Sequence, residues 1–497
     1  MHARIPFLRW MLVCLLAAAA GAGLRAQNAS QTKPPSTPAQ PSGTPADASR
    51  GSDAPPPGKG GVSTPNDDPF PSTYRMPAAK PFAIRNASIL TAAGPLIQNG
   101  TIVVRDGKIA AVGANVSVPA DAEVIDARGK FVTPGIIDDH SHLGVYAAPG
   151  VQAHSDGNEA TKPNTAEVWA EHSVWPQDPQ FPRNLAGGVT TLQVLPGSAN
   201  LFGGRSVVLK VVPARTVQEM KFPGAKYGLK MACGENPKRV YQQRGPSTRM
   251  GNVAGYRAAW IQAEQYRRKW DKWLADKSDK KGEAPQRDLA QETLAEVLRG
   301  HVLVHNHCYR ADEMAQMIDI AKEFGYQIRS FHHVVEGYKI GDLLAREKIA
   351  ASVWADWGGF KMEALDSVKT NAAIIHTAGG RAIIHSDDPS GSQRLNQEAA
   401  KAMAAGNAAG LRITPEDAIK WVTLNPAWAI GLDDKIGSLA PGKNADLVLW
   451  SGNPFSVYTR TEKVWIDGTL RYDRGAPANR WRTDFELGFM PLTEGAR

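Results

Sequence analysis

Cysteine is scarce in this chain of 497 residues, which contains only three. Cys14 lies in an apolar segment near the N-terminus, so Cys233 and Cys308 are the two that remain beyond it. Small secreted domains that depend on a disulfide framework carry many more cysteines for their length. No Cys-x-x-Cys pair occurs, which argues against the common cysteine-ligated structural zinc site. The length is sufficient for a large core and more than one domain.

The N-terminus lacks an apolar run long enough for a membrane span. Residues 10–20 are apolar, whereas a spanning helix needs about 20 such residues. Arg4 and Arg9 precede or flank this run, and small residues lead to a cleavage point after Ala26. We therefore predict that residues 1–26 are an export signal and that the mature protein is periplasmic or secreted. Retention of this segment as an anchor is the only membrane contact that we expect.

A large excess of one charge is also missing. The chain has 57 Lys and Arg against 49 Asp and Glu, a formal net charge of +8. Loss of the three arginines in the predicted signal leaves +5, which is mild for this length. Outside one segment, no stripe of basic residues with interleaved aromatics occurs, so nucleic acid is not an expected partner.

Two β-rich arms flank a long middle segment. Short β-rich runs are separated by Asn99-Gly100 and Asp106-Gly107, which are typical of hairpin turns. The stretch before the first arm is rich in Pro, Ser and Gly and has few large apolar side chains. It therefore cannot bury enough apolar surface to offset the conformational entropy that is lost on folding. The predicted organisation is a disordered linker at 27–73, a β-sandwich built from 74–133 with 432–480, a barrel at 134–431 and a C-terminal tail at 481–497.

The middle segment alternates short apolar strands with helical stretches, which is typical of an α/β fold. Such alternation over roughly 300 residues predicts a (β/α)8 TIM barrel, whose sites lie at the C-terminal ends of its strands. A doubly wound open sheet is the alternative, but no Gly-rich phosphate loop follows a strand. Residues from about 242 to 300 interrupt the pattern. The spacing of Trp260, Trp270 and Trp273 predicts an amphipathic helix that packs on its own domain, in an insertion over the active face.

A His-x-His pair follows the apolar run that begins at Phe131. On a strand, residues i and i+2 share a face, so His140 and His142 can converge on one metal ion. Alone, such a pair is a weak indication, because most His-x-His pairs bind no metal. Its position directly after a strand, preceded by Asp138 and Asp139, strengthens the prediction.

The wider sequence around this pair resembles the amidohydrolase superfamily. The matching segments are 99–113, 124–142, 425–432 and 437–450, and they occur in the family's order. The resemblance extends over about residues 82–472 and is closest to the imidazolonepropionase-like and Xaa-Pro-dipeptidase-like branch. It implies a metal-dependent hydrolase with further ligands at later strand ends.

The resemblance implies ligands on the fifth, sixth and eighth strands. Of the two histidines in the fifth-strand motif, His305 is the better ligand, and His307 contacts metal, substrate or a hydrogen-bonded neighbour. The sixth-strand motif favours His333. Because adjacent strand residues face opposite ways, His332 is expected to pack away from the centre. Asp387, in the eighth-strand motif, takes the superfamily's catalytic position.

The fourth-strand ligand has two candidates. Lys230 lies within a strand-like run and would bridge two metals if carbamylated, which requires a neutral, buried amine. Glu235 follows in a loop and is already an anionic oxygen donor suited to zinc. We favour Glu235, with a surface turn residue as its ordinary alternative. The number of metals is left open.

These residues predict hydrolysis with an activated water and no nucleophilic Ser or Cys. Zinc is the expected metal, with Mn²⁺, Fe²⁺ or Co²⁺ as alternatives, and Asp387 would accept and transfer the proton. Arg249 is a candidate for binding a substrate carboxylate, although a surface position is its ordinary interpretation. Tyr338 is a comparable substrate-binding candidate, and Cys308 is interpreted as a packing residue.

The predicted reaction is hydrolysis of an amide bond in a small peptide-like or cyclic substrate. A lactone or an N-acyl amino acid would use the same centre, since the fold does not select the substrate. A non-catalytic exported binding protein is the alternative from another class. The expected partner is a small molecule, and a homo-oligomer is compatible with the sequence, which does not determine the oligomeric state.

Overall fold

The structure of the chain, a computed structural model, describes residues 63–66, 68–278 and 282–476. The predicted export signal, most of the predicted linker and the predicted tail lie outside these residues. Within the described part of the chain, no helix combines the length and the apolar character that a membrane-spanning helix requires.

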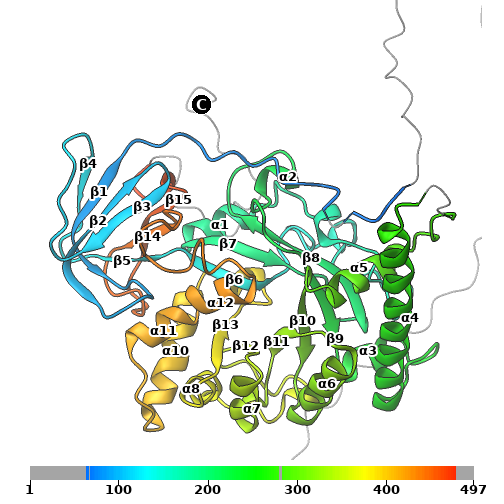
Figure 1. The fold of residues 1–497 in the computed structure, drawn as a ribbon. Helices are drawn as coiled ribbons and strands as arrows, with labels where there is room; N and C mark the ends of the chain where they lie inside the picture. Colours follow the sequence, from blue (N-terminus) through cyan, green and yellow to red (C-terminus); the bar gives the residue numbers. More distant parts are fainter. Residues whose placement is uncertain (1–62, 67, 279–281, 477–497) are drawn as a thin grey trace, which may run out of the picture. The chain divides into compact units, whose positions relative to one another are not determined.

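Both ends of the chain contribute strands to one eight-stranded sheet (Figure 1). Its order is β16-β15-β14-β5-β1-β2-β3, with β4 paired to β1, and the antiparallel β5–β14 pair joins the two arms. Phe82 and Trp465 stack with ring centroids 5.3 Å apart although their strands are not neighbours, so the sheet folds over a shared apolar core. The two arms therefore form the predicted composite β domain. Its strands are β1 (Phe82–Ile89), β2 (Ile97–Arg105), β3 (Lys108–Gly113), β4 (Glu123–Asp126), β5 (Phe131–Pro134), β14 (Leu447–Trp450), β15 (Thr461–Ile466) and β16 (Thr469–Asp473).

One of the two predicted hairpin turns is present. Asp106 and Gly107 join β2 to β3, with φ of 52° and 71°, as a two-residue turn with both residues left-handed requires. The prediction for Asn99-Gly100 is wrong, because both residues lie inside β2 where its register with β1 shifts. Asn99 has φ of 50°, and a bulge accommodates this left-handed residue without reversing the chain.

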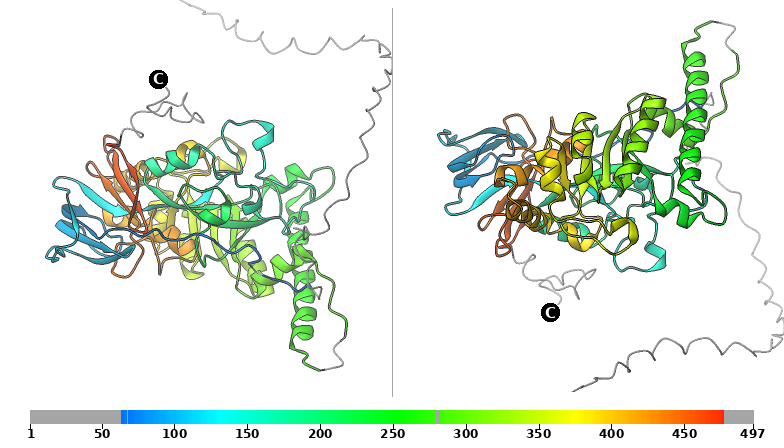
Figure 2. Two further views of the ribbon diagram at one scale, coloured as in Figure 1. Left: turned by 90° about the horizontal axis from the view of Figure 1, so that it is seen from above. Right: turned by 90° about the horizontal axis from the view of Figure 1, so that it is seen from below.

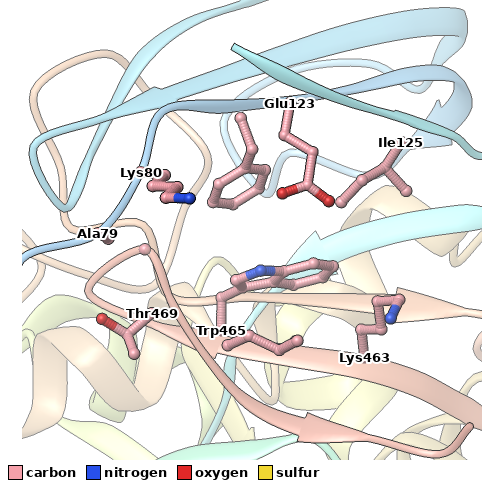
Figure 3. A pocket seen from close by; sticks show the side chains of 10 residues that line it. Ala79, Lys80, Glu123, Ile125, Lys463, Trp465 and Thr469 are labelled. Carbon is pink, nitrogen blue, oxygen red and sulfur yellow. The ribbon is translucent and has the colours of Figure 1, made fainter.

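The β domain also contains a cavity of about 230 Å³. Glu123 and Ile125 approach it from one side and Trp465 and Lys463 from the other (Figure 3). No histidine lines this cavity, which is therefore separate from the predicted metal residues.

The second sheet forms the barrel, in the order β13-β12-β11-β10-β9-β8-β7-β6. Many of its strands are buried on both faces, because helices cover the outside and side chains fill the inside. The strands are β6 (Ile136–Ser141), β7 (Val189–Val194), β8 (Phe202–Lys210), β9 (Gly228–Ala232), β10 (Leu303–Cys308), β11 (Ile328–His333), β12 (Ala350–Val353) and β13 (Arg381–Ile384). The helices are α1 (Gln180–Ala186), α2 (Val217–Met220), α3 (Glu235–Val240), α4 (Arg249–Ala275), α5 (Leu289–Leu298), α6 (Ala311–Phe324), α7 (Gly341–Arg346), α8 (Asn371–Thr377), α9 (Pro389–Ser392), α10 (Leu395–Ala408), α11 (Pro415–Lys420) and α12 (Leu424–Ala429).

The third barrel strand runs against its neighbours. β8 pairs antiparallel with both β7 and β9, while the other paired barrel strands are parallel. Only residues 195–201 connect β7 to β8. A parallel connection needs a crossover of a dozen or more residues, so this short link imposes the reversal.

The first and last barrel strands meet through an intervening segment. Ile384 donates its backbone N–H to Trp421 O at 3.0 Å, and Ile137 donates to Val422 O at 2.9 Å. Closer to the site, Asp387 N donates to His140 O at 3.1 Å. These bonds bring the ends of β6 and β13 together at one mouth of the barrel.

The predicted insertion packs beside the barrel and does not cover its active face. Figure 2 shows α4 standing at one side of the barrel in both views. Trp260 is fully buried against Phe202 and Tyr326, and Trp270 is also buried. The predicted packing of this helix is therefore correct, whereas its predicted position was wrong. The buried side chains of α4 pack against α5, α6 and Phe202 of β8, which holds the helix beside the barrel.

The predicted linker is too long at its C-terminal end. Asp68 accepts a hydrogen bond from Lys221 Nζ at 2.8 Å, and Tyr74 is buried. The Tyr74 hydroxyl donates to Asp467 Oδ2 at 2.7 Å, and Lys210 Nζ lies 2.9 Å from the same carboxylate. This buried network connects the segment before β1, the barrel strand β8 and the turn between β15 and β16.

Candidate metal centre and active site

The His-x-His pair lies at the end of β6, as the two-residue spacing predicts. His140 and His142 are buried, and their ring centroids are 5.1 Å apart. Asp387 reaches both, with Oδ1 3.1 Å from His142 Nε2 and 3.3 Å from His140 Nε2. The potential ligand atoms of these three residues all lie within 4.8 Å of one another. The structure therefore brings the first- and eighth-strand candidates together.

A second group shares His140 with two other histidines. His333, at the end of β11, and His385, directly after β13, place ligand atoms within 4.8 Å of one another and of His140. The His333 ring stacks on Trp354 with centroids 4.4 Å apart, which fixes its orientation. No role was predicted for His385. Its position directly after β13 and two residues before Asp387 was the signal that could have identified it.

The fourth-strand candidate that reaches the histidines is Lys230. Its side chain is fully buried on β9, and Nζ lies 3.2 Å from His140 Nε2. Burial lowers the pKa of Lys230 to about 8. Glu235, which the sequence analysis favoured, begins α3, and its Oε1 pairs with Lys361 Nζ at 3.2 Å. The structure does not bring Glu235 to the histidines, because the chain turns into α3 after the strand.

The two histidines of β10 have different neighbours. His305 Nδ1 lies 2.9 Å from His332 Nε2, and His332 Nδ1 lies 2.9 Å from His140 Nδ1. His307 is nearer the strand's C-terminal end, and its ring centroid is 4.5 Å from that of His333. His307 thus lies beside another candidate ligand, and the prediction that His305 is the better ligand stays a prediction.

His332 does not pack away from the centre, contrary to the alternation rule. The rule assumes extended backbone, but His333 has φ of 73° and Val334 has φ of 38°. This left-handed turn redirects the His333 side chain, so both adjacent rings face the barrel interior. His332 then joins His140 and His305 through both of its ring nitrogens.

Burial keeps the imidazoles neutral. It lowers the pKa of His305 and of His385 to about 3 and that of the other fully buried rings well below its ordinary value. Burial alone would raise the pKa of Asp387, but the neighbouring His333 and His142 lower it below its usual value. The half-buried Asp387 is therefore an ionised carboxylate.

Two further acids lie beneath the histidines. Asp138 accepts a hydrogen bond from the Ser386 hydroxyl, and Asp139 accepts one from the Ser352 hydroxyl. Burial raises the pKa of Asp138 to about 7 and that of Asp139 to about 8. These hydrogen bonds connect β6 to β12 and to the end of β13.

The donor set fits a divalent metal. Among the described residues, four buried imidazole nitrogens have no hydrogen-bond partner, namely His305 Nε2, His307 Nδ1, His333 Nδ1 and His385 Nδ1. Leaving a buried polar atom without a partner is costly, and neutral imidazole nitrogens with a carboxylate are ligands that zinc and related ions accept. A bound divalent ion would satisfy the open nitrogens of His333 and His385, which form one candidate group with His140.

The predicted substrate-binding residues lie elsewhere. Arg249 opens α4, where Nε lies 3.0 Å from Glu313 Oε1 and the guanidinium also pairs with Glu363. The structure places the guanidinium between these two carboxylates, and substrate binding by Arg249 stays a prediction. Tyr338 lies in a short 3₁₀ turn, with its ring 5.6 Å from Lys339 Nζ, and the structure does not bring it to the histidines.

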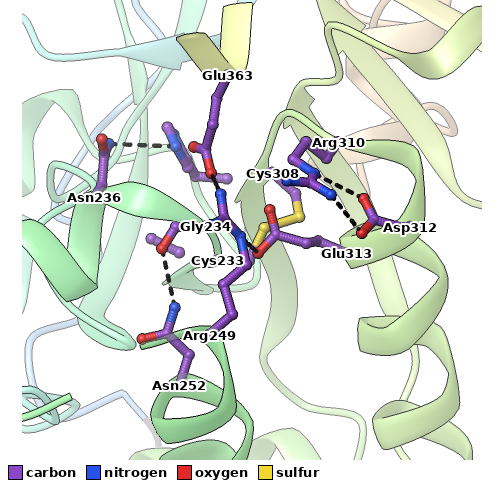
Figure 4. The surroundings of a disulfide bond; sticks show 12 residues. Cys233, Gly234, Asn236, Arg249, Asn252, Cys308, Arg310, Asp312, Glu313 and Glu363 are labelled. Atoms are coloured by element: carbon purple, nitrogen blue, oxygen red, sulfur yellow. Dashed lines mark hydrogen bonds and ion pairs between the residues drawn. A yellow bond between two sulfur atoms is a disulfide. The ribbon is translucent and has the colours of Figure 1, made fainter. Parts of the chain in front are cut away.

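Cys308 is not a simple packing residue. It forms a disulfide with Cys233, which joins the ends of β10 and β9 directly beside His307 (Figure 4). The two Cα atoms are 5.2 Å apart, and Cys233 N also donates to His307 O at 2.9 Å. Sequence spacing alone does not predict this pair, because the two cysteines are separated by 75 positions and meet only when the strands become neighbours.

Comparison with known proteins agrees with this geometry. Residues 131–471 match the amidohydrolase family. The chain belongs to the amidohydrolase family. This confirms the family resemblance and the (β/α)8 barrel inferred from sequence, and it supports a hydrolase that acts on carbon–nitrogen bonds.

Three relatives illustrate the similarity. Amidohydrolase tasK of Hapsidospora irregularis is 34% identical over 400 residues, which cover 76% of this chain and 40% of tasK. An imidazolonepropionase of Bacillus cytotoxicus is 21% identical over 425 residues, covering 77% of this chain and 92% of that protein. The crystal structure of an amidohydrolase from Thermotoga maritima MSB8 is 38% identical, with a TM-score of 0.72, and covers 79% of this chain and 100% of that one.

Proposed function

We propose that this chain is a divalent-metal-dependent hydrolase that cleaves an amide bond in a small peptide-like or cyclic substrate. The observation that carries the proposal is the group of buried histidines around Asp387, several of which have a ring nitrogen without a partner. Family membership supports the same chemistry. Lactones and N-acyl amino acids are the alternative substrates within this chemistry.

The residues suit one or two ions, with zinc as the first candidate. His140, His142 and Asp387 would hold one ion, and His333 and His385, in the group that shares His140, would hold a second. When bound, such an ion supplies Lewis acidity, which lowers the pKa of water and polarises a carbonyl. His332 lies against His140 and would orient it, as hydrogen-bonded neighbours of metal ligands commonly do.

Lys230 is the proposed fourth-strand ligand, in place of Glu235. Its Nζ already lies 3.2 Å from His140 Nε2, whereas Glu235 is paired with Lys361. Carbamylation of an amine requires its neutral form, and a pKa of about 8 makes this form accessible near neutral pH. The carbamate would place two anionic oxygens among the histidines.

Asp387 is the proposed proton-transfer residue. Its carboxylate is ionised and half-buried, so it can accept a proton from the attacking water and still exchange with solvent. Passing that proton to the amine would allow the nitrogen to leave as a neutral group.

A hydrolysis screen tests the proposal. The purified, zinc-loaded protein is assayed with and without a chelator on dipeptides, Xaa-Pro dipeptides, N-acyl amino acids, lactones and imidazolonepropionate. We expect chelator-sensitive turnover of one class. If the zinc-loaded protein hydrolysed none of these substrates, the proposal would be contradicted, and a binding protein on an inactive barrel would be favoured.

Two neighbouring acids provide a matched pair of variants. Asp387→Asn should lower kcat by about 10²- to 10⁴-fold, the range of general acid–base catalysis, when it is assayed at saturating zinc because Asp387 is also a proposed ligand. Asp388→Asn should retain activity, because the Asp388 side chain caps α9 by accepting a hydrogen bond from Gly391 N. Full activity of Asp387→Asn would remove its proposed role.

Export is part of the proposal. It rests on the N-terminal sequence and is supported by the Cys233–Cys308 disulfide, because structural disulfides persist in oxidising compartments. Cell fractionation with detection of the processed N-terminus tests it. Accumulation of the unprocessed chain in the cytoplasm would contradict it.

A further inference from the structure

The loop that follows β12 forms an aromatic wall beside the candidate metal centre. Trp354 stacks on His333, and Trp357 stacks on the outer side of Trp354 with centroids 5.8 Å apart. Phe360 meets Trp354 edge-on at 5.7 Å. Trp354 is buried, but Trp357 and Phe360 are 43% and 56% exposed. The wall thus extends from a candidate metal ligand to solvent, where large aromatic side chains are not used for packing.

A lysine lies at the edge of this wall. Lys361 Nζ donates to Asn236 Oδ1 at 3.0 Å and pairs with Glu235 Oε1 at 3.2 Å. The ammonium also lies 4.2 Å from the centre of the Tyr309 ring. Its side chain is only 20% exposed. An ammonium has three N–H donors, and two of them suffice for the oxygens of Asn236 and Glu235. The third donor can bind another acceptor.

This lysine is close to the histidines. Asn236, which accepts its hydrogen bond, places Nδ2 3.3 Å from His307 Nε2, so a single amide group separates Lys361 from a candidate metal ligand. Tyr309, beneath the ammonium, has its ring centroid 4.6 Å from that of His307 and 5.4 Å from that of His333. A substrate at the metal centre would therefore have a cation and an apolar wall on the same side.

We propose that Lys361 binds a carboxylate of the substrate and that Trp357 and Phe360 receive an apolar side chain. The substrate class is an amide whose amine portion is an amino acid with a free carboxylate and a large apolar side chain. This inference rests on the proposed amide hydrolysis and specifies its substrate. The carboxylate takes no part in bond making or breaking, so Lys361 determines binding and orientation.

Glu235 gives Lys361 an alternative role as half of a structural ion pair. In that case, removing the ammonium would affect all ligands alike. If Lys361 instead binds substrate, its removal would affect only ligands with a carboxylate. The experiment therefore compares a carboxylate with its uncharged carboxamide.

The probes are N-acetyl-L-phenylalanine and N-acetyl-L-phenylalaninamide, which differ only in this charge. Binding to the zinc-loaded wild-type protein is followed by stopped-flow tryptophan fluorescence in the phase before turnover, with Trp354 and Trp357 as nearby reporters. The wild-type protein should bind the carboxylate roughly 10- to 100-fold more tightly, the range of one charge-assisted hydrogen bond. Lys361→Met should abolish this preference, leave carboxamide binding unchanged, and so show that the wall is intact.

Two further variants complete the test. Lys361→Arg keeps the charge and should retain part of the preference. Lys369→Met removes an exposed charge from the same loop and should retain all of it. Equal binding of both probes by the wild-type protein, equal weakening of both by Lys361→Met, or binding of neither would overturn the inference. Turnover in the substrate screen tests the proposed hydrolysis separately, since binding selectivity does not depend on it.

Discussion

Breaking the Cys233–Cys308 disulfide should lower the stability of the whole chain and leave the metal centre in place. The bond closes a loop between positions 75 residues apart. In the chain-entropy description, a loop of that length removes about 15 cal/mol/K from the unfolded chain, or about 4.5 kcal/mol at 25 °C. The native strands are already held in register by backbone pairing, including His307 with Ala232, so the folded state should change little.

Single and double variants separate this effect from packing. Cys233→Ala and Cys308→Ala each break the same bond, so each should lower the free energy of unfolding by most of the 4.5 kcal/mol. The double variant should be only slightly less stable than either single variant, because the bond can be lost only once. Equilibrium urea unfolding followed by tryptophan fluorescence measures the differences, and elemental analysis measures zinc.

Additive losses of less than about 1 kcal/mol from each single variant would refute this reasoning and show that the cysteines act by packing alone. Loss of zinc without loss of stability would show instead that the bond positions His307. Reduction of the wild-type protein under denaturing conditions, followed by refolding in reductant, should reproduce the stability of the double variant.

The remaining predictions concern the metal centre and the buried ion network. Lys230→Ala should lower metal affinity at least about 10-fold, whereas Glu235→Gln should retain the metal content, as measured by elemental analysis. Zinc at about 100 times its Kd should raise the free energy of unfolding by about 2.7 kcal/mol, and a chelator should reverse the resulting rise in Tm. Lys210→Met should cost about 3–5 kcal/mol in urea unfolding because it leaves the buried Asp467 carboxylate without its cation, and adding Asp467→Asn should recover part of the loss. Arg105→Met, in an exposed pair, should change the unfolding midpoint little, and an equal effect of the Arg105 and Lys210 variants would contradict this account.

Local patterns in the sequence were sufficient for much of the fold. Alternating apolar strands and helices predicted the barrel, and β-rich arms at both ends predicted the composite sheet, because each pattern reflects burial of a single element. The spacing of His140 and His142 predicted their common face for the same reason. Asp106-Gly107 was correctly predicted as a turn, since both of its residues need the left-handed conformation that the hairpin requires.

The tertiary structure decided features that depend on where the chain turns or on residues far apart in sequence. Asn99-Gly100 became a bulge because the neighbouring strand continues past it. His332 faces inward because the backbone of His333 leaves the extended conformation, so strand alternation no longer applies. These outcomes depend on a few dihedral angles, which sequence periodicity does not specify.

The sequence by itself determined which residue types could form a metal centre and that they follow barrel strands. Only the tertiary structure placed Lys230, and not Glu235, against His140, and only it paired Cys233 with Cys308. The physical reason is that a motif specifies local geometry within one element. A coordination site or a disulfide depends on distances between elements, and packing of the whole barrel sets those distances.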